Sequence, residues 1–167
     1  MMPGVPEPRK YAAVLTEDLW HLSKVAPPKG ARAFENRYFS VRFLSYGIRG
    51  HSAESYKAEL VCRHEYAWDE CSVVWNFIWA KWASCFHDAI YQWAEALAKL
   101  WGCTVKEVLA WADAVFLERM LQDCHTKGEV FMAHVYFAGV RVFGYRYHQI
   151  ARFFRSISGR PLGIIKS

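Results

Sequence analysis

The sequence predicts a mainly α-helical fold, in which a helical bundle ends in a helix-turn-helix and an irregular or small β element lies near residues 34–50. Three observations favour this fold. An apolar stripe with helical spacing runs through residues 69–101. A tight turn with helix-capping signals follows at residues 102–107. The last 38 of the 167 residues carry six Lys or Arg and no carboxylate. We expect an N-terminal arm and extension over residues 1–68 and a helical domain over residues 69–167.

The N-terminal third gives weaker signals. Residues 1–10 are expected to form a loose arm. Thr16, followed by two acidic residues, predicts the start of a helix that extends to about Val25 and is ended by the Pro and Gly residues at 27–30. Residues 31–50 alternate like a strand around Val41 but would also suit a helix, and both interpretations stay open. Ser52 then predicts the start of a helix that has Tyr56, Leu60 and His64 on one side.

The clearest periodic segment begins after Asp69, which can cap a helix. Apolar residues recur there in steps of three and four, which is typical of a helix that buries one face. Because 33 residues are long for one globular helix and Asp88 could cap a new one, we expect a break near residues 84–88. Trp residues at this spacing indicate core packing rather than a platform for stacked bases. The stripe consists of Ser72, Trp75, Trp79, Trp82, Phe86, Ile90, Trp93, Leu97 and Leu100 or Trp101.

The next boundary carries the most specific local signal. Gly102 stands where a helix C-terminus favours glycine, and Thr104 with Glu107 forms a capping box, in which each side chain satisfies a backbone N–H of the other residue. We therefore expect a helix from Val105 to about Asp123. A further helix is expected over residues 129–143, closed by Gly144.

The net charge of +5 conceals three opposed blocks. Residues 1–63 carry +4, residues 64–129 carry −5 and residues 130–167 carry +6. Such asymmetry indicates a localised surface for nucleic acid or for an anionic membrane. The basic block is interleaved with apolar residues, which argues against a simple solvated charge run.

The basic ending has the spacing of a helix-turn-helix over residues 145–166. Ile150, Ala151 and Phe154 would face inward from its first helix, and Leu162 and Ile165 would anchor the second. In such a unit the second helix enters the major groove while basic side chains hold phosphates. Any amphipathic helical hairpin gives a similar pattern. The residues expected to contact DNA are Arg141, Arg146, His148, Arg152, Arg155, Ser156, Ser158, Arg160 and Lys166.

Residues 94–109, AEALAKLWGCTVKEVL, resemble the opening of the C-terminal DNA-binding domain of the bacterial replication initiator DnaA. The aromatic segments at 135–137 and 144–147, and residues 150–154, fall where that family places the helices leading into its helix-turn-helix. The resemblance covers about residues 88–167. The family's origin-reading run, Gly-Gly-Arg-Asp-His-Thr-Thr-Val, corresponds here to residues 155–162, of which only the apolar anchor Leu162 is kept. The resemblance implies a stand-alone module that binds double-stranded DNA and regulates transcription, as in phage proteins and gene transfer agent activators.

The same sequence argues against an enzyme. No GxSxG, HExxH, GxxxxGK[ST] or GxGxxG motif occurs, and we expect no cofactor. His64-Glu65 and His87-Asp88 are the nearest acid-base neighbours, but adjacent residues diverge by about 100° on a helix. Cys62 with His64, and Cys85 with His87, have the composition of two zinc half-sites, but the spacing favours core packing over a metal.

Five cysteines without a CxxC pair favour a cytoplasmic location, and neither a signal peptide nor a membrane-spanning segment is expected. The alternative function is a non-enzymatic helical interaction protein, such as a phage-encoded inhibitor or a small subunit of a nucleoprotein complex. Its acidic, Trp-rich middle would bind a protein such as the transcription machinery, and its basic tail would follow a nucleic-acid backbone.

Overall fold

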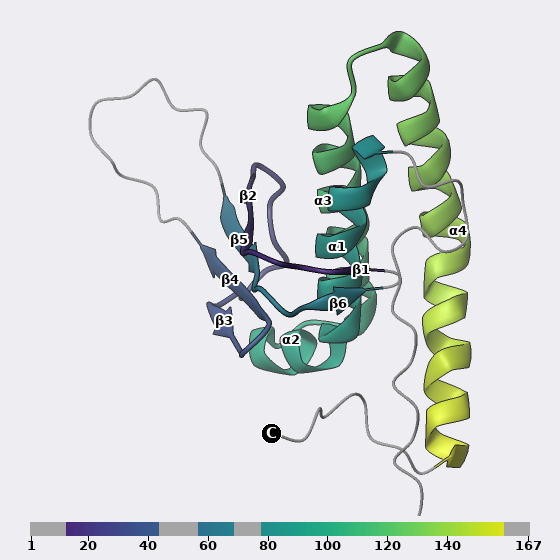
Figure 1. The fold of residues 1–167 in the computed structure, drawn as a ribbon. Coiled ribbons are helices and arrows are strands. Elements are labelled where there is room, and N and C mark those ends of the chain that lie inside the picture. Colours follow the sequence, from purple (N-terminus) through teal and green to yellow (C-terminus); the bar gives the residue numbers. More distant parts are fainter. Residues whose placement is uncertain (1–12, 44–56, 69–77, 159–167) are drawn as a thin grey trace, which may run out of the picture.

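The computed structural model describes residues 13–43, 57–68 and 78–158. Within these ranges the chain is a mixed α/β protein, with six strands in the first part of the chain and four helices in the second (Figure 1). The expectation of a mainly α-helical bundle was therefore wrong. None of the described helices is both long and apolar enough to cross a membrane.

The main sheet has four antiparallel strands in the order β2-β5-β4-β3. Its central strands pair over five residues, so that Phe39 lies opposite Cys62 and Val41 opposite Leu60. A separate two-stranded ladder joins β1 to β6. The strand bounds are β1 Ala13–Val14, β2 Leu19–Ser23, β3 Phe34–Glu35, β4 Phe39–Phe43, β5 Ala58–Cys62 and β6 Ala67–Trp68.

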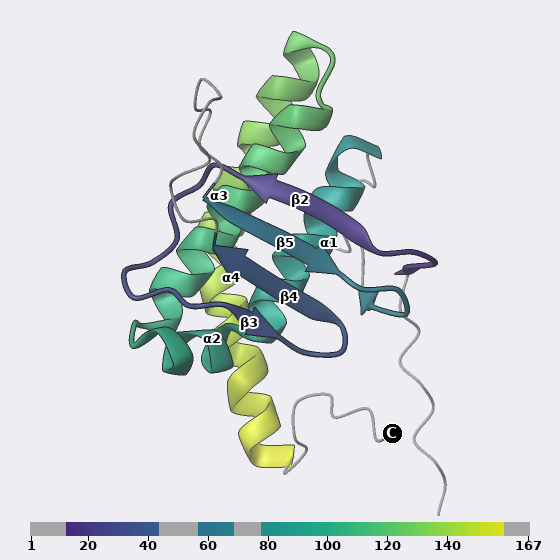
Figure 2. The same ribbon diagram turned by 90° about the vertical axis from the view of Figure 1, so that its left-hand side faces the viewer.

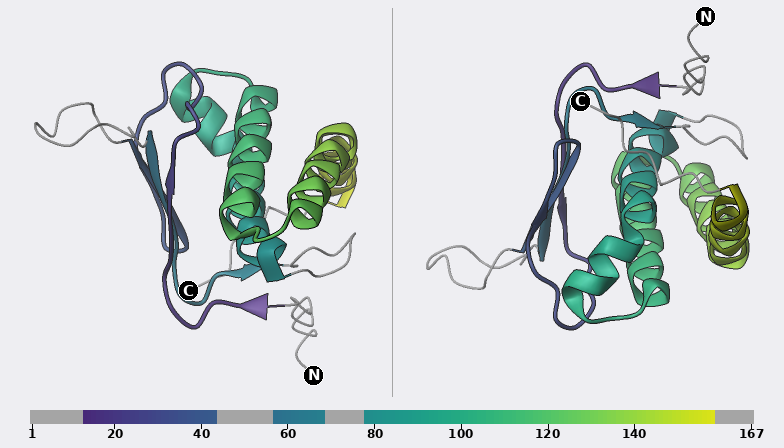
Figure 3. Two further views of the ribbon diagram at one scale, coloured as in Figure 1. Left: turned by 90° about the horizontal axis from the view of Figure 1, so that it is seen from above. Right: turned by 90° about the horizontal axis from the view of Figure 1, so that it is seen from below.

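The helices form two further layers. Helices α1 and α3 pack against each other, with α2 at one end, and cover one face of the sheet (Figures 1 and 2). Helix α4 packs on the side of this layer that faces away from the sheet (Figure 3). The helix bounds are α1 Ile78–Gln92, α2 Ala94–Trp101, α3 Val105–Asp123 and α4 Lys127–Ser158.

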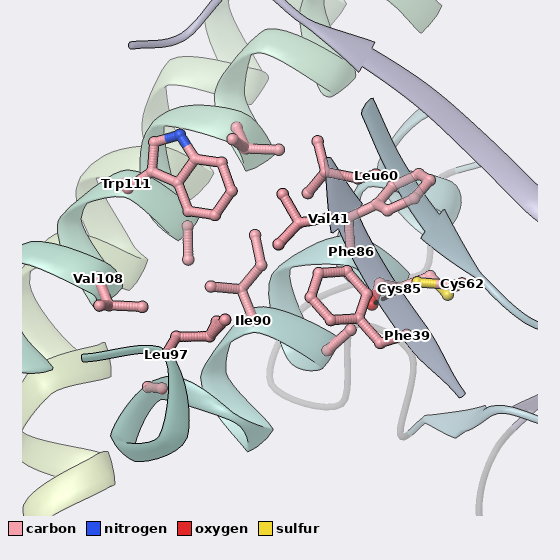
Figure 4. Packing of buried hydrophobic residues seen from close by; sticks show 14 of the residues in the cluster. Phe39, Val41, Leu60, Cys62, Cys85, Phe86, Ile90, Leu97, Val108 and Trp111 are labelled. Carbon is pink, nitrogen blue, oxygen red and sulfur yellow. Dashed lines mark hydrogen bonds between the residues drawn. The ribbon is translucent and has the colours of Figure 1, made fainter. Parts of the chain in front are cut away.

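The main core lies between the sheet and the first helical layer (Figure 4). Phe39, Val41 and Leu60 from the sheet and Phe86 and Ile90 from α1 are completely buried. A smaller core between α1, α3 and α4 is built around Trp79, Met120, Ala133 and Tyr136. The strands up to Trp68 and the helices α1, α2 and α3 therefore share the main core.

Both N-terminal helices expected from the sequence are strands. The segment expected as a helix from Thr16 to Val25 holds β2, and the described part of the segment expected to start at Ser52 holds β5. In β2 the inward-facing residues are His21 and Ser23, so polar side chains conceal the alternation that marks a half-buried strand. The acidic Asp18 does not serve a helix N-terminus: its carboxylate accepts hydrogen bonds from the backbone N–H of His64 and from Arg63. Residues 31–50, for which the sequence allowed either a strand or a helix, contain strands β3 and β4.

The helical predictions were correct where local signals are strong. Helix α3 spans Val105–Asp123 as expected, Thr104 and Glu107 form the capping box, and Gly102 adopts a left-handed conformation with φ of 67°. The expected break at residues 84–88 was wrong, since α1 continues to Gln92. The helix is interrupted instead at Trp93, whose ring stacks on Phe39. The expected end at Gly144 was also wrong, because α4 continues to Ser158.

Gly30 lets the loop between β2 and β3 pass close to the end of α2. Its φ is +83°, and a Cβ atom there would lie 2.5 Å from the carbonyl oxygen of Trp101. The indole N–H of Trp101 in turn donates a 2.7 Å hydrogen bond to the carbonyl of Arg32. Only glycine combines this conformation with this close approach.

Candidate functional site

A buried polar cluster joins the helices α1, α3 and α4. We call it the His87 cluster, and it consists of His87, Asp88, Tyr91, Asp113 and Arg141. Nε2 of His87 lies 3.2 Å from Oδ1 of Asp113, and Nδ1 lies 3.3 Å from Oδ1 of Asp88. The hydroxyl of Tyr91 donates a 2.7 Å hydrogen bond to the same Oδ1 of Asp113. Asp113 on α3 is therefore the acceptor shared by two side chains of α1.

The surroundings of His87 favour its charged form. Burial alone would lower its pKa, but the hydrogen bonds to Asp113 and Asp88 outweigh burial and raise the pKa to about 9. An imidazolium donates from both ring nitrogens, which is what two flanking carboxylates require. Burial and the neighbouring charge of Asp113 raise the pKa of Tyr91, so its hydroxyl stays protonated and donates a hydrogen bond to Asp113.

Helix α4 completes the cluster from the outside. Nη1 of Arg141 lies 3.5 Å from Oδ2 of Asp113, and about half of the Arg141 side chain is exposed. Gly144 lies one turn further along α4, where a Cβ atom would come within 2.6 Å of the Tyr91 hydroxyl oxygen. The missing side chain thus lets α4 approach α1 closely. A cleft of about 240 Å³ opens beside the cluster and is lined by Tyr91, Lys106, Leu109, Ala110, Asp113, Arg141 and Val142.

The geometry of the His87 cluster suits a structural tie better than a reactive centre. Both nitrogens of His87 face a carboxylate, and the hydroxyl of Tyr91 points at Asp113. A general base needs an unoccupied acceptor atom aimed at its substrate. The cleft exposes instead two cationic side chains at its rim, Lys106 and Arg141.

A second polar cluster ties the sheet to the helices. Oε2 of Glu118 on α3 accepts hydrogen bonds from Nε2 of His21 at 3.1 Å and from the hydroxyl of Ser23 at 2.6 Å. Oε1 accepts the backbone N–H of Lys24 at 2.7 Å. Burial alone would raise the pKa of Glu118, but these three hydrogen bonds outweigh burial and lower it. Since Ser23 donates to Glu118, this Ser-Glu-His group lacks the hydrogen bond from serine to histidine that activates a serine nucleophile.

The nine residues predicted to contact DNA divide into three groups. Arg141 is described with its side chain, at the rim of the cleft. Arg160 and Lys166 lie outside the described residues. Six others occupy positions on the C-terminal half of α4, with only their backbone described: Arg146, His148, Arg152, Arg155, Ser156 and Ser158. The segment predicted as the first helix of a helix-turn-helix therefore belongs to the end of α4, and most of the segment predicted as the second helix lies outside the described residues.

Most of the Trp residues in the middle of the chain belong to the cores. Trp68, Trp79, Trp101 and Trp111 are buried, and Trp82 and Trp93 are partly buried against the main core. Cys62 and Cys85 are completely buried in that core, as favoured from the sequence. Among the residues that the structure describes, no group of three or more His, Cys, Asp or Glu side chains is placed to hold a metal ion.

Sequence reasoning missed the His87 cluster. It considered His87 with Asp88 and set the pair aside, because neighbours on a helix diverge, and it did not consider Asp113, which is 26 residues away. A signal was present: His87 and Tyr91 are four residues apart on α1, and so share one side of the helix. No family model, no curated protein and no solved structure matches this chain.

Proposed function

We propose that this protein binds double-stranded DNA through the C-terminal half of α4. The observation that supports the proposal is the form and charge of this helix. Helix α4 runs without a break for 32 residues, and its end extends past α2 and out of the helical layer (Figures 1 and 2). After Glu129 it contains no carboxylate, and it carries four arginines between positions 141 and 155.

Helical spacing places the basic positions along one side. Positions 141, 148, 152 and 155 follow in steps of seven, four and three, which keeps them on one side of an α-helix. An α-helix fits the major groove of B-form DNA, which is about 12 Å wide. Arginine binds phosphates through two parallel hydrogen bonds and reads guanine in the same way. A projecting basic helix thus supports contact with a duplex.

In this proposal the long helix α4 contacts the DNA in place of a compact helix-turn-helix. Positions 145–158 form the projecting end of α4, and the segment expected to supply the second helix follows directly. With DNA binding we propose the regulatory role that the resemblance to the DnaA domain implies. The alternative, an interaction protein that uses its Trp-rich middle, has less support, because most of those Trp side chains are packed in the cores.

Titration of the full chain with a fluorescently labelled duplex of random sequence tests the proposal. We expect fluorescence anisotropy to detect binding, and its affinity to fall steeply with salt, with a slope of about −0.9 for each phosphate contact. Replacing both Arg152 and Arg155 by Ala should weaken binding and flatten the slope by about two contacts. Arg37→Ala is the matched control, since Arg37 is an exposed arginine of the sheet region, where it pairs with Glu65 and lies over the ring of Tyr38. Equal losses in both variants would place the DNA elsewhere on the protein.

Selection from a pool of randomised duplexes separates a reader of sequence from a binder of the backbone. We expect the full chain to enrich one sequence, with a preference of 10³ or more over random DNA. Arg160→Ala should relax this preference while leaving binding to random duplexes largely unchanged. If the pool remains random after selection by the wild-type chain, the protein binds only the DNA backbone and does not recognise a sequence.

A further inference from the structure

The cleft beside the His87 cluster is hollow because a small residue lies between longer ones. Lys106, Ala110 and Asp113 are separated by four and three residues, so they share the face of α3 that lines the cleft. The methyl group of Ala110 leaves space between the two longer side chains, and Arg141 lines the cleft from α4. Its volume of about 240 Å³ lies below the range of about 300–1,000 Å³ that is typical of pockets for drug-sized ligands. The cleft therefore suits a small chemical group rather than a whole cofactor.

Two cations that lack acidic partners on their own helices meet at this cleft. Lys106 makes no hydrogen bond or ion pair with the part of the chain that the structure describes. Its neighbour Glu107 is turned back to the start of α3, where Oε2 accepts hydrogen bonds of 2.7 Å from the backbone N–H and the hydroxyl of Thr104. The positions three and four residues before and after Lys106 and Arg141 hold no acidic residue. Like charges that face one cleft repel each other, and a bound anion removes this repulsion.

The carboxylate of Asp113 also lines the cleft, but its charge is balanced from within the protein. Its Oδ1 accepts a hydrogen bond from Tyr91 and lies 3.2 Å from Nε2 of the charged His87. Only 5% of the Asp113 side chain is exposed, against 48% of Arg141. Arg141 meets Oδ2 through Nη1, and a guanidinium has five N–H donors, so others remain available to a ligand. The two cations at the rim and the charged His87 outnumber Asp113 and Asp88, which leaves the cleft with a net positive charge.

We propose that the cleft binds a phosphate group between Lys106 and Arg141. Arginine offers parallel N–H donors that match phosphate oxygens, and lysine adds a second point charge. We expect this phosphate to belong to the backbone of the duplex, so the inference rests on the proposed function. Arg141 is the first of the basic positions 141, 148, 152 and 155 along one side of α4, and position 148 follows about 10 Å further along the helix. Lys106, which was not among the residues predicted to contact DNA, thereby extends the DNA-contacting surface from α4 to α3.

Fluorescence anisotropy of the full chain with a labelled duplex of random sequence, in a buffer without phosphate, tests the duplex as the source of the phosphate. Lys106→Met removes the charge but keeps most of the length of the side chain. We expect it to weaken binding by about threefold or more at about 0.1 M NaCl, and to flatten the salt slope by about one contact. Lys99→Met is the matched control, because Lys99 is an exposed lysine of α2 that does not line the cleft, and this variant should bind like the wild type.

Ala110→Leu separates the shape of the cleft from its charge. Leucine fills the hollow and leaves both cations in place, so this variant should lose about as much duplex affinity as Lys106→Met. The double variant should lose little more than either single variant, because both changes remove the same contact. Ala96→Leu, at an exposed alanine of α2, is the control for the added side chain, and circular dichroism checks that each variant is folded.

A titration with sodium phosphate, followed by NMR of the backbone amides, tests a small molecule as the source. We expect the amide signals of Lys106 and Ala110 to shift at millimolar phosphate in the wild type and to stay in place in Lys106→Met. If they shift but Lys106→Met binds the duplex like the wild type, the phosphate comes from a small molecule and the link to DNA is overturned. If neither experiment responds to Lys106→Met, or if Lys99→Met has the same effect, the phosphate site itself is overturned. Wild-type affinity after replacement of both Arg152 and Arg155, with weaker binding by Lys106→Met, would instead reject the proposed function of α4.

Discussion

Protonation of His87 should make the stability of this protein fall on the alkaline side of neutrality. The pKa of His87 rises from 6.5 to about 9 in the folded chain, so the folded state holds the proton more tightly than the unfolded state. The resulting stability is fully present below pH 6.5 and is lost as the pH rises through about 9. A shift of this size corresponds to about 3 kcal/mol in the free energy of unfolding, of which about 2.5 kcal/mol remains at pH 7 and almost none at pH 10.

His87→Gln isolates this contribution. Glutamine keeps a neutral donor near Asp113 but cannot carry the charge, so the part of the stability that depends on His87 protonation disappears. Urea unfolding followed by tryptophan fluorescence, at half-unit steps from pH 6 to 10, gives the free energy of unfolding of each chain. The wild type should lose about 2.5 kcal/mol more than the variant between pH 7 and pH 10. Because buried Trp79 and Trp111 become exposed on unfolding, the signal reports the helical layers directly.

The control for this experiment is His134→Gln. His134 is exposed on α4, where Nδ1 lies 2.8 Å from the carbonyl oxygen of Val130, and its replacement should leave the alkaline slope unchanged. Parallel curves for the wild type and His87→Gln over the whole range would refute the charged His87 cluster. The same conclusion would follow from an imidazole titration of His87, observed by NMR, with its midpoint below pH 7.

Three further substitutions test other parts of the fold. Glu118→Gln should lower the free energy of unfolding by about 2–3 kcal/mol at pH 7, because it removes a charged acceptor of three hydrogen bonds. As the pKa of Glu118 is lowered in the folded state, urea unfolding should find that this difference shrinks as the pH falls below 4.5. Gly30→Ala should cost about 2–3 kcal/mol and lower the melting temperature by about 5–10 °C, because its Cβ would meet the backbone of Trp101. Thr104→Ala should cost about 1 kcal/mol in urea unfolding through loss of the capping box.

Each of these substitutions has an outcome that contradicts its reasoning. If the difference in the free energy of unfolding between the wild type and Glu118→Gln stays constant down to pH 4, Glu118 does not contribute to the loss of stability in acid. If Gly30→Ala melts within 1 °C of the wild type, the loop does not press on α2 as described. A Thr104→Ala chain as stable as the wild type would mean that tertiary packing alone fixes the start of α3.

The parts of the fold that the sequence predicted are those decided by neighbouring residues. The capping box at Thr104 and the left-handed glycine at 102 act within one turn, and they set the end of α2 and the start of α3. Strand β2 was not predicted, because its inward residues are polar and their partner Glu118 lies 97 residues away from His21. Gly144 did not end α4, because one glycine inside a helix costs only about 1 kcal/mol, and its close contact with Tyr91 fixes it in place.

The candidate site likewise has one part that the sequence predicted and one part that it did not. The basic composition of the chain's end was readable, since charge is a property of each residue. The His87 cluster was not, because its geometry exists only after α1, α3 and α4 have packed.

The contact of His21 with Glu118 has a consequence for synthesis of this protein on the ribosome. At about 5–20 residues per second, the 97 residues between these partners take about 5–20 s to be made after His21. Once Cys62 has been made, β2 to β5 are complete, but the helices that cover them are not. The sheet carries Phe39, Val41 and Leu60 on the face that later becomes the core. A nascent chain that has not yet reached α3 is therefore the state of this protein with the greatest need for a chaperone.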